Sequence, residues 1–135
     1  MSVELLTPDG MLTGTPYHHV AVSTGSRLVA VAGQIGQRGD EPVAVDDLAA
    51  QVAQALRNVA LGLSAAGGGF ADVVRLTFYA TRWTPDRMDD FMRGVESVAD
   101  ELDLPRPLPP SSLIGVDVLF HPDVLVEVEA TAVLA

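Results

Sequence analysis

The segment at residues 124–132, Val-Leu-Val-Glu-Val-Glu-Ala-Thr-Ala, constrains the fold more than any other part of the chain. Successive side chains of a strand point to opposite faces, so one face is wholly apolar and the other carries Glu127 and Glu129. A strand this apolar is predicted to lie at the centre of a sheet. Two carboxylates ~7 Å apart on one face are costly against a core, which makes them the first candidates for chemistry. The alternative is a solvated sheet face, as in many antiparallel sheets.

The size of the chain predicts one domain, residues 1–135, with ample material for a core because 48% of the residues are hydrophobic. No cysteine is present, which excludes disulfides, thiolate metal sites and a thiol nucleophile. The sequence begins without the basic region and apolar run of a secretion signal, and it has no membrane-length apolar window. We therefore expect a cytoplasmic protein without a membrane partner.

The charge of the chain indicates which partners to exclude. The formal net charge is −10, and all eight basic residues are arginines. Phosphate-rich partners require a basic footprint, so the charge argues against nucleic acid.

The first third of the chain is predicted to be mostly strand and loop. Two apolar runs, residues 19–23 and 28–32, are joined by Thr-Gly-Ser-Arg and suggest a β-hairpin. A strand at residues 3–6 is weakly indicated before a loop rich in glycine and proline.

Two helices are predicted from apolar spacing. The first begins after Asp46 as its cap, places Gln51 on its polar outer face and ends at the glycines 67–69. The second begins at Thr84 as its cap, with Pro85 in its first turn, and continues to Leu102.

The remaining strands are predicted at residues 72–80, 113–120 and 124–133, with an extended proline-rich connector at 104–110. The element order excludes a helical bundle and a regular nucleotide-binding βαβ fold. It predicts an α/β (α+β) fold, a mixed sheet with both helices on one face. The other face must be covered by water or by another molecule, and self-association is the economical answer.

Several motifs, in order, resemble the RidA/YjgF superfamily, the reactive-intermediate deaminases also called endoribonuclease L-PSP. The resemblance covers nearly the whole chain, and each motif is weak alone. The motifs are Pro16-Tyr17, Val31-Ala32-Gly33-Gln34, residues 51–59, Ala66-Gly67 with residues 72–77, and residues 125–132.

The resemblance implies a chorismate-mutase-like fold and a homotrimer with ligand clefts between subunits. It implies hydrolysis of a small imine or enamine to a ketone and ammonia without a metal or an organic cofactor. A non-catalytic ligand-binding or regulatory trimer is the alternative function. Ribonuclease activity follows only from the family's second name and is disfavoured by the net charge.

The resemblance also implies which residues form the site. Glu127 matches the glutamate that orients the attacking water, and the substrate-binding positions correspond to Tyr17, Ala32, Gly33, Asp90, Ser111 and Leu113. Active members hold a substrate carboxylate with an arginine where this chain has Ser111, and Ala32 and Asp90 also depart from the family pattern. A serine offers neither the charge nor the fork of donors that a carboxylate needs. We therefore expect a neutral or cationic ligand, unless Arg106 compensates.

Two other motifs suggest sites only weakly. His18 and His19 are adjacent, and adjacent strand residues point to opposite faces, so metal binding is not expected. The glycine run at residues 67–69 follows a helix, which indicates a helix stop and not a phosphate loop.

Overall fold

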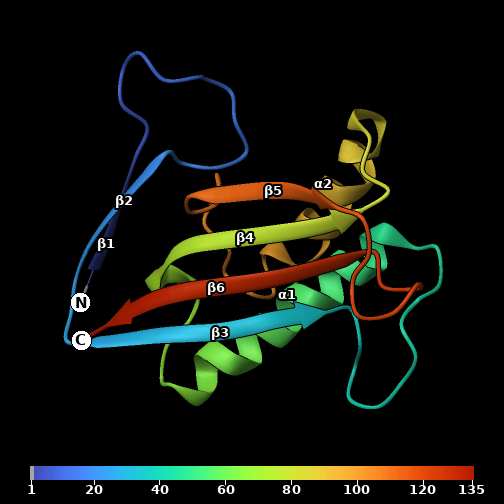
Figure 1. Cartoon of the computed structure of the whole chain (residues 1–135). Coiled ribbons are helices and arrows are strands. Elements are labelled where there is room, and N and C mark those ends of the chain that lie inside the picture. The colour runs from blue at the N-terminus through green and yellow to red at the C-terminus, as the bar shows by residue number, and fades with distance from the viewer. Residues whose placement is uncertain (1) are drawn as a thin grey trace.

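The computed structural model describes residues 2–135, which form six strands, two α-helices and two short 3₁₀ turns in the predicted order. Four strands make the main sheet: β3 (Arg27–Ile35), β6 (Val126–Leu134), β4 (Val73–Thr81) and β5 (Ser111–Val116), in that spatial order. β6 is antiparallel to both neighbours, and β5 is parallel to β4. The mixed sheet is therefore confirmed, with the alternating strand inside it (Figure 1).

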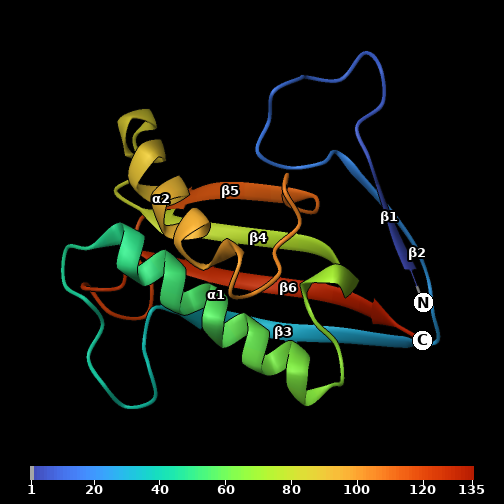
Figure 2. The same ribbon diagram turned by 180° about the vertical axis from the view of Figure 1, so that it is seen from behind.

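Both helices cover the same face of this sheet. α1 (Leu48–Ala65) lies across β3 and β6, and α2 (Met88–Ala99) packs beside α1 (Figure 2). In α2, Phe91 meets Phe78 of β4 edge to face, with ring centroids 5.0 Å apart. The side chains of Val126, Val128 and other alternate residues of β6 are buried beneath the helices. The predicted two-helix arrangement on one face is thus correct.

The predicted hairpin at residues 19–32 is wrong in its pairing. β2 (Val20–Thr24) pairs with β1 (Ser2–Leu6) in a separate two-stranded sheet, while β3 pairs with β6. The link between β2 and β3 packs on the end of β6: Ser26 donates its N–H to the Leu134 carbonyl, and Gly25 leaves no room there for a Cβ. This contact turns the chain away from the main sheet, so β2 finds its partner in β1.

The N-terminal cap of α1 lies one residue later than the sequence predicts, and the predicted C-terminal stop is correct. The cap is Asp47, whose carboxylate accepts the N–H of Ala50, while Asp46 takes a left-handed conformation. At the other end Gly67 has φ of +87°, and Gly68 donates to the Leu63 carbonyl. Glycine stops the helix because it adopts this conformation without strain.

Two further boundaries are corrected. Thr84 gives no side-chain cap: a 3₁₀ turn, Pro85–Arg87, comes first, and α2 ends at Ala99. β5 spans Ser111–Val116 and stops short of Phe120, because its partner β4 ends at Thr81, which pairs with Val116. An edge strand without a partner on either side has no ladder to continue.

Gln51 was predicted to face solvent from α1, but its side chain is fully buried. Its Nε2 donates to the carbonyls of Ala44 and Asp123 at 2.9 Å each, and its Oε1 accepts the N–H of Leu125 at 2.9 Å. One amide therefore joins α1, the loop before it and the entry to β6.

We expect Gln51→Met to lower the free energy of unfolding by about 2–4 kcal/mol, because the Leu125 N–H and two carbonyls lose their buried partner. Urea denaturation followed by circular dichroism measures the change. Gln54→Met is the matched control one helical turn away, since Gln54 only donates to Asn58 and is partly exposed. Equal losses in the two variants would contradict the role given to Gln51.

Candidate functional site

The face of the sheet opposite the helices, called the open face below, carries most of the ionisable side chains of the four strands. The register defines it because directly paired residues share a face. Its members are Leu28, Ala30 and Ile35 of β3, Glu127, Glu129, Thr131 and Val133 of β6, Arg75, Thr77, Tyr79 and Thr81 of β4, and Ser112, Ile114 and Val116 of β5. The prediction that Glu127 and Glu129 share one face is confirmed.

Glu127 lies against the backbone of Gly33. A Cβ added at Gly33 would overlap the carboxylate of Glu127, so only glycine admits the side chain in this position. The Glu127 carboxylate has no hydrogen bond or ion pair within residues 2–135. The structure thus brings two of the candidate residues together, with Ala32 exposed beside them, and leaves the carboxylate free to bind a water or a ligand.

Glu129 is held by a tyrosine that sequence reasoning did not single out. The Tyr79 hydroxyl donates to Oε1 of Glu129 at 2.7 Å, and Tyr79 is directly opposite Glu127 in the ladder. This hydrogen bond raises the pKa of Tyr79, with smaller contributions from burial and from the charges of both glutamates. The alternation of β4 placed Tyr79 on a face, but only the register shows that this face is that of Glu127.

Arg75 is the cation of the open face, and it too was missed. Its Nη2 donates to the Ser112 hydroxyl at 2.6 Å, and no carboxylate of the described chain lies within ion-pair distance. Arg75 is opposite Thr131, about four residues along β6 from Glu127, or ~13 Å. A small ligand on Glu127 of the same chain does not reach Arg75.

Ser111 and Leu113 lie on the other side of the sheet from Glu127. Ser111 is opposite Leu76, and Leu113 is opposite Phe78, whose side chain packs against α2. The Ser111 hydroxyl donates to the carbonyl of Pro109, and Leu113 packs on the edge of the core. Two strands also separate β5 from β3, so one chain does not bring these residues to Gly33.

Tyr17 and Asp90 are also remote from Glu127 within the chain. Tyr17 forms a bridge with Leu108, just before β5, and its ring lies 5.2 Å from that of His19. Asp90 is on the exposed side of α2, where it accepts from Arg93 at 2.6 Å. The substrate-binding residues implied by the resemblance therefore fall into two groups, one on each side of the sheet.

The part of the chain that the structure describes contains no cluster of three or more side chains of the kind that ligate metals. Among the described helices, none is both long and apolar enough to cross a bilayer.

Comparison with known proteins agrees with this fold over its full length. The family described as endoribonuclease L-PSP matches residues 9–134. A Rid family protein of unknown function from Yersinia pestis, YyfB, is 32% identical with a TM-score of 0.86, over 99% of this chain and 100% of that one. No curated protein matches the chain significantly.

Two Escherichia coli structures are similar at lower identity. The YjgF gene product is 27% identical over 96% of this chain and 98% of that one, with a TM-score of 0.68. TdcF, a structure with bound serine, is 27% identical over 100% and 99% of the two chains, with a TM-score of 0.66.

We expect Tyr79 to titrate above the ordinary tyrosine pKa of about 10, because the Glu129 carboxylate accepts a hydrogen bond from the protonated Tyr79 hydroxyl. The hydrogen bond stabilises the fold below that unfolded-state pKa, and its contribution is lost as the pH rises through the higher folded value. Absorbance of phenolate at 295 nm in Tyr17→Phe, where Tyr79 is the sole tyrosine, measures the pKa.

Glu129→Ala in the same background should move this titration down toward 10, whereas Glu101→Ala, which removes an exposed carboxylate elsewhere, should leave it unchanged. A Tyr79 that titrates near 10 with Glu129 intact would show that the hydrogen bond is not formed in solution.

Proposed function

This chain belongs to the endoribonuclease L-PSP family, which includes the Rid and YjgF proteins, and from that membership we propose that it hydrolyses a small imine or enamine lacking a carboxylate. The observation that carries the proposal is the Glu127 carboxylate, seated on Gly33 without a hydrogen-bond partner in residues 2–135. A carboxylate in this state accepts a hydrogen bond from water and can act as a general base.

The reaction needs no group beyond water and one carboxylate. Glu127 takes a proton from water as the water oxygen forms a bond to the imine carbon, and it passes this proton to the imine nitrogen, which gives a neutral carbinolamine. The carboxylate then takes the hydroxyl proton of the carbinolamine and passes it to the amino nitrogen as the carbon–nitrogen bond breaks, so the products are a carbonyl compound and ammonia. Backbone groups near Gly33 lie next to the Glu127 carboxylate and, since glycine has no side chain of its own, can contact a substrate held there.

We infer that the active unit is a homotrimer with its clefts between subunits. Glu127, Gly33 and Ala32 lie on one side of the sheet, whereas Ser111 and Leu113 lie on the other, so a neighbouring copy must supply the second group. The open face also exposes apolar side chains: Leu28 is 75% exposed and Ile114 is 44% exposed. Exposed apolar side chains on a sheet face favour association with another surface.

The substrate class follows from the residue at position 111. Ser111 uses its hydroxyl on the Pro109 carbonyl and brings no positive charge. Arg106 points toward Glu96 and Asp100 at the end of α2 and not toward Ser111, so it does not replace the missing arginine. Because Asp90 is paired with Arg93, the substrate class is inferred from Ser111 and Glu127 alone. A cleft with a free carboxylate and no guanidinium at position 111 disfavours a carboxylate ligand.

A non-catalytic trimer that binds a small ligand is the second candidate, and the missing arginine favours it, because the family's anchor for the substrate is absent. The two functions differ in turnover. A protein that binds neutral ketones but hydrolyses no imine supports the second candidate over the first.

We expect wild-type protein to accelerate hydrolysis of a neutral imine, such as that formed from a simple ketone and ammonia, and to hydrolyse 2-iminobutyrate little faster than buffer. Glu127→Gln should reduce the neutral-imine rate by 10²-fold or more because the general base is lost. Trapping the surviving imine with semicarbazide measures both rates.

Glu101→Gln is the matched control, since it alters an exposed glutamate paired with Arg57 far from the open face. Ser111→Arg tests the substrate class: it should bind 2-oxobutyrate about tenfold to a hundredfold more tightly, as a charge-assisted pair forms. Efficient wild-type hydrolysis of 2-iminobutyrate that requires Glu127 would overturn the proposed substrate class.

We expect light scattering to give three times the 14.2 kDa chain mass. The contact must be largely apolar because three copies each carry a net charge of −10. Leu28→Asp on the open face should shift the protein toward monomer, and Leu61→Asp, a similarly exposed leucine of α1, is the control. A stable monomer at micromolar concentration would remove the intersubunit cleft and the site with it.

A further inference from the structure

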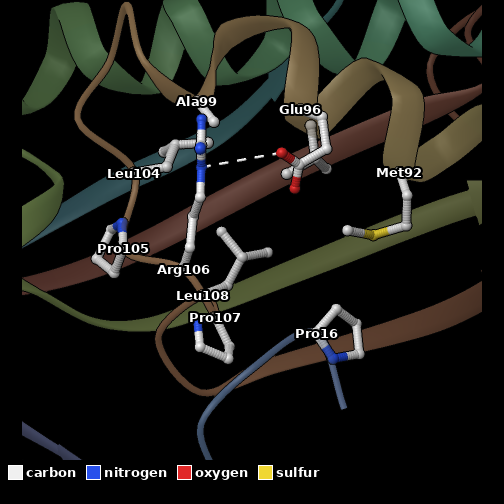
Figure 3. A pocket seen from close by; sticks show the side chains of 10 residues that line it. Pro16, Met92, Glu96, Ala99, Leu104, Pro105, Arg106, Pro107 and Leu108 are labelled. Atoms are coloured by element: carbon white, nitrogen blue, oxygen red, sulfur yellow. Dashed lines mark ion pairs between the residues drawn. The ribbon is translucent and has the colours of Figure 1, made fainter. Parts of the chain in front are cut away.

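A pocket of about 360 Å³ lies on the helix side of the sheet, between α2 and the proline-rich connector at residues 104–108. Small-molecule sites in proteins have volumes of this order. Figure 3 shows the pocket from close by, with Met92 and Glu96 of α2 on one side and the connector on the other. It is separate from the open face, because the sheet lies between them.

The walls of the pocket are apolar except for two opposite charges. Val95, Ala99, Leu104 and Leu108 supply buried apolar surface. Arg106 and Glu96 point toward each other, with 3.8 Å between Nε and Oε2 (Figure 3). At this distance the two groups attract but form no hydrogen bond, so each retains capacity for a ligand.

The ion pairs of Arg106 are weak enough to be rearranged. Its Nη2 donates to Asp100 at 2.8 Å, but the Asp100 side chain is 98% exposed. Exposed pairs of this kind contribute little to stability. The guanidinium has five N–H donors in a fixed fork, and its Nε has no hydrogen-bond partner within the described chain.

We propose that this pocket binds a free α-amino acid with an apolar side chain. The ligand carboxylate accepts from Arg106, the ammonium group donates to Glu96, and the side chain enters the apolar interior. Such a ligand contacts all three features of the lining, namely Arg106, Glu96 and the apolar interior. A charge-assisted hydrogen bond at each end fixes its orientation.

The two charges of the pocket disfavour ligands that have the same apolar side chain but only one charged group. A carboxylic acid alone places its negative charge beside Glu96, and an amine alone places its positive charge beside Arg106. A zwitterion meets an opposite charge at both ends. It is also neutral overall, so the net charge of −10 does not repel it.

This site goes beyond the proposed function and does not rest on it. Glu127 lies on the open face, and Ser111, the position of the family's arginine, is not among the residues that line the pocket. The amino acid is thus a second ligand and not the substrate of the Glu127 cleft.

Isothermal titration calorimetry of the wild-type protein with L-leucine tests the proposal. Three analogues each remove one feature: 4-methylpentanoate lacks the ammonium, isoamylamine lacks the carboxylate, and glycine lacks the side chain. We expect each to bind at least about tenfold more weakly than leucine.

Two substitutions assign the contacts. Arg106→Gln should weaken leucine at least about tenfold and strengthen isoamylamine, whereas Glu96→Gln should weaken leucine and strengthen 4-methylpentanoate. Arg57→Gln, which breaks an exposed pair with Glu101 outside the pocket, and Glu127→Gln should leave leucine affinity unchanged.

Three results would overturn the proposal: no saturable binding of leucine at about 10 mM or below, leucine affinity unaffected by both Arg106→Gln and Glu96→Gln, or affinity lost in Glu127→Gln. The last result would place the ligand in the cleft of the open face. Circular dichroism of each variant confirms that the fold is kept, as expected for side chains about half exposed.

Discussion

The rest of the structure depends on β6, which is hydrogen-bonded to β3 on one edge and to β4 on the other. Pairing on both edges fixes the side of the sheet on which each side chain of β6 lies. Its alternate apolar residues lie beneath α1 and α2, so Glu127 and Glu129 must lie on the open face. A one-residue slip would bury both carboxylates under the helices, where an unpaired charge is strongly unfavourable. The register of the core and the position of the candidate base are therefore the same constraint.

Two amide side chains of α1, one buried and one partly buried, hold the chain around this strand in one arrangement. Gln51 holds the segments on either side of it, at Ala44 and at Asp123, and so fixes where β6 begins. Asn58, two turns further along α1, donates to the carbonyls of Ile35 and Gln37 at the end of β3. The end of β3 that carries Gly33 is thus set by α1, and Glu127 is set against it by the same helix. Polar contacts in the core position the site as well as stabilising the fold.

The sequence predicted the features that depend on local pattern. The two helices, the glycine stop after α1 and the alternation of β6 were all correct, because each is decided within a few residues. The hairpin at residues 19–32 was wrong, since the contact that decides it joins Ser26 to Leu134. Gln51 was also misplaced: its spacing matches the polar face of α1, and only the loops that fold over that face reveal its burial. Burial of this kind is not visible in a helical period.

The candidate site shows the same difference between features set by local pattern and features set by long-range strand pairing. Gly33 and Glu127 meet because β3 and β6 pair, but Ser111 and Leu113 fall on the far side of the sheet. The face of a residue depends on the register with Leu76 and Phe78, and no pattern within β5 states that register. Arg75 and Tyr79 were missed for the same reason, since each becomes part of the open face only through pairing with β6.

The sheet also separates the two proposed kinds of ligand chemistry within one short chain. On the open face the Glu127 carboxylate has no cation within ion-pair distance, since Arg75 lies further along the ladder opposite Thr131, and this disfavours acids. On the helix side Arg106 and Glu96 stand together over an apolar pocket, which favours a ligand with both charges. The core between them is closely packed, and Phe78 of β4 contacts Phe91 of α2, the helix that lines the pocket. Packed cores shift between discrete arrangements and do not deform continuously, so this packing is one physical route by which a ligand at one site can bias the other.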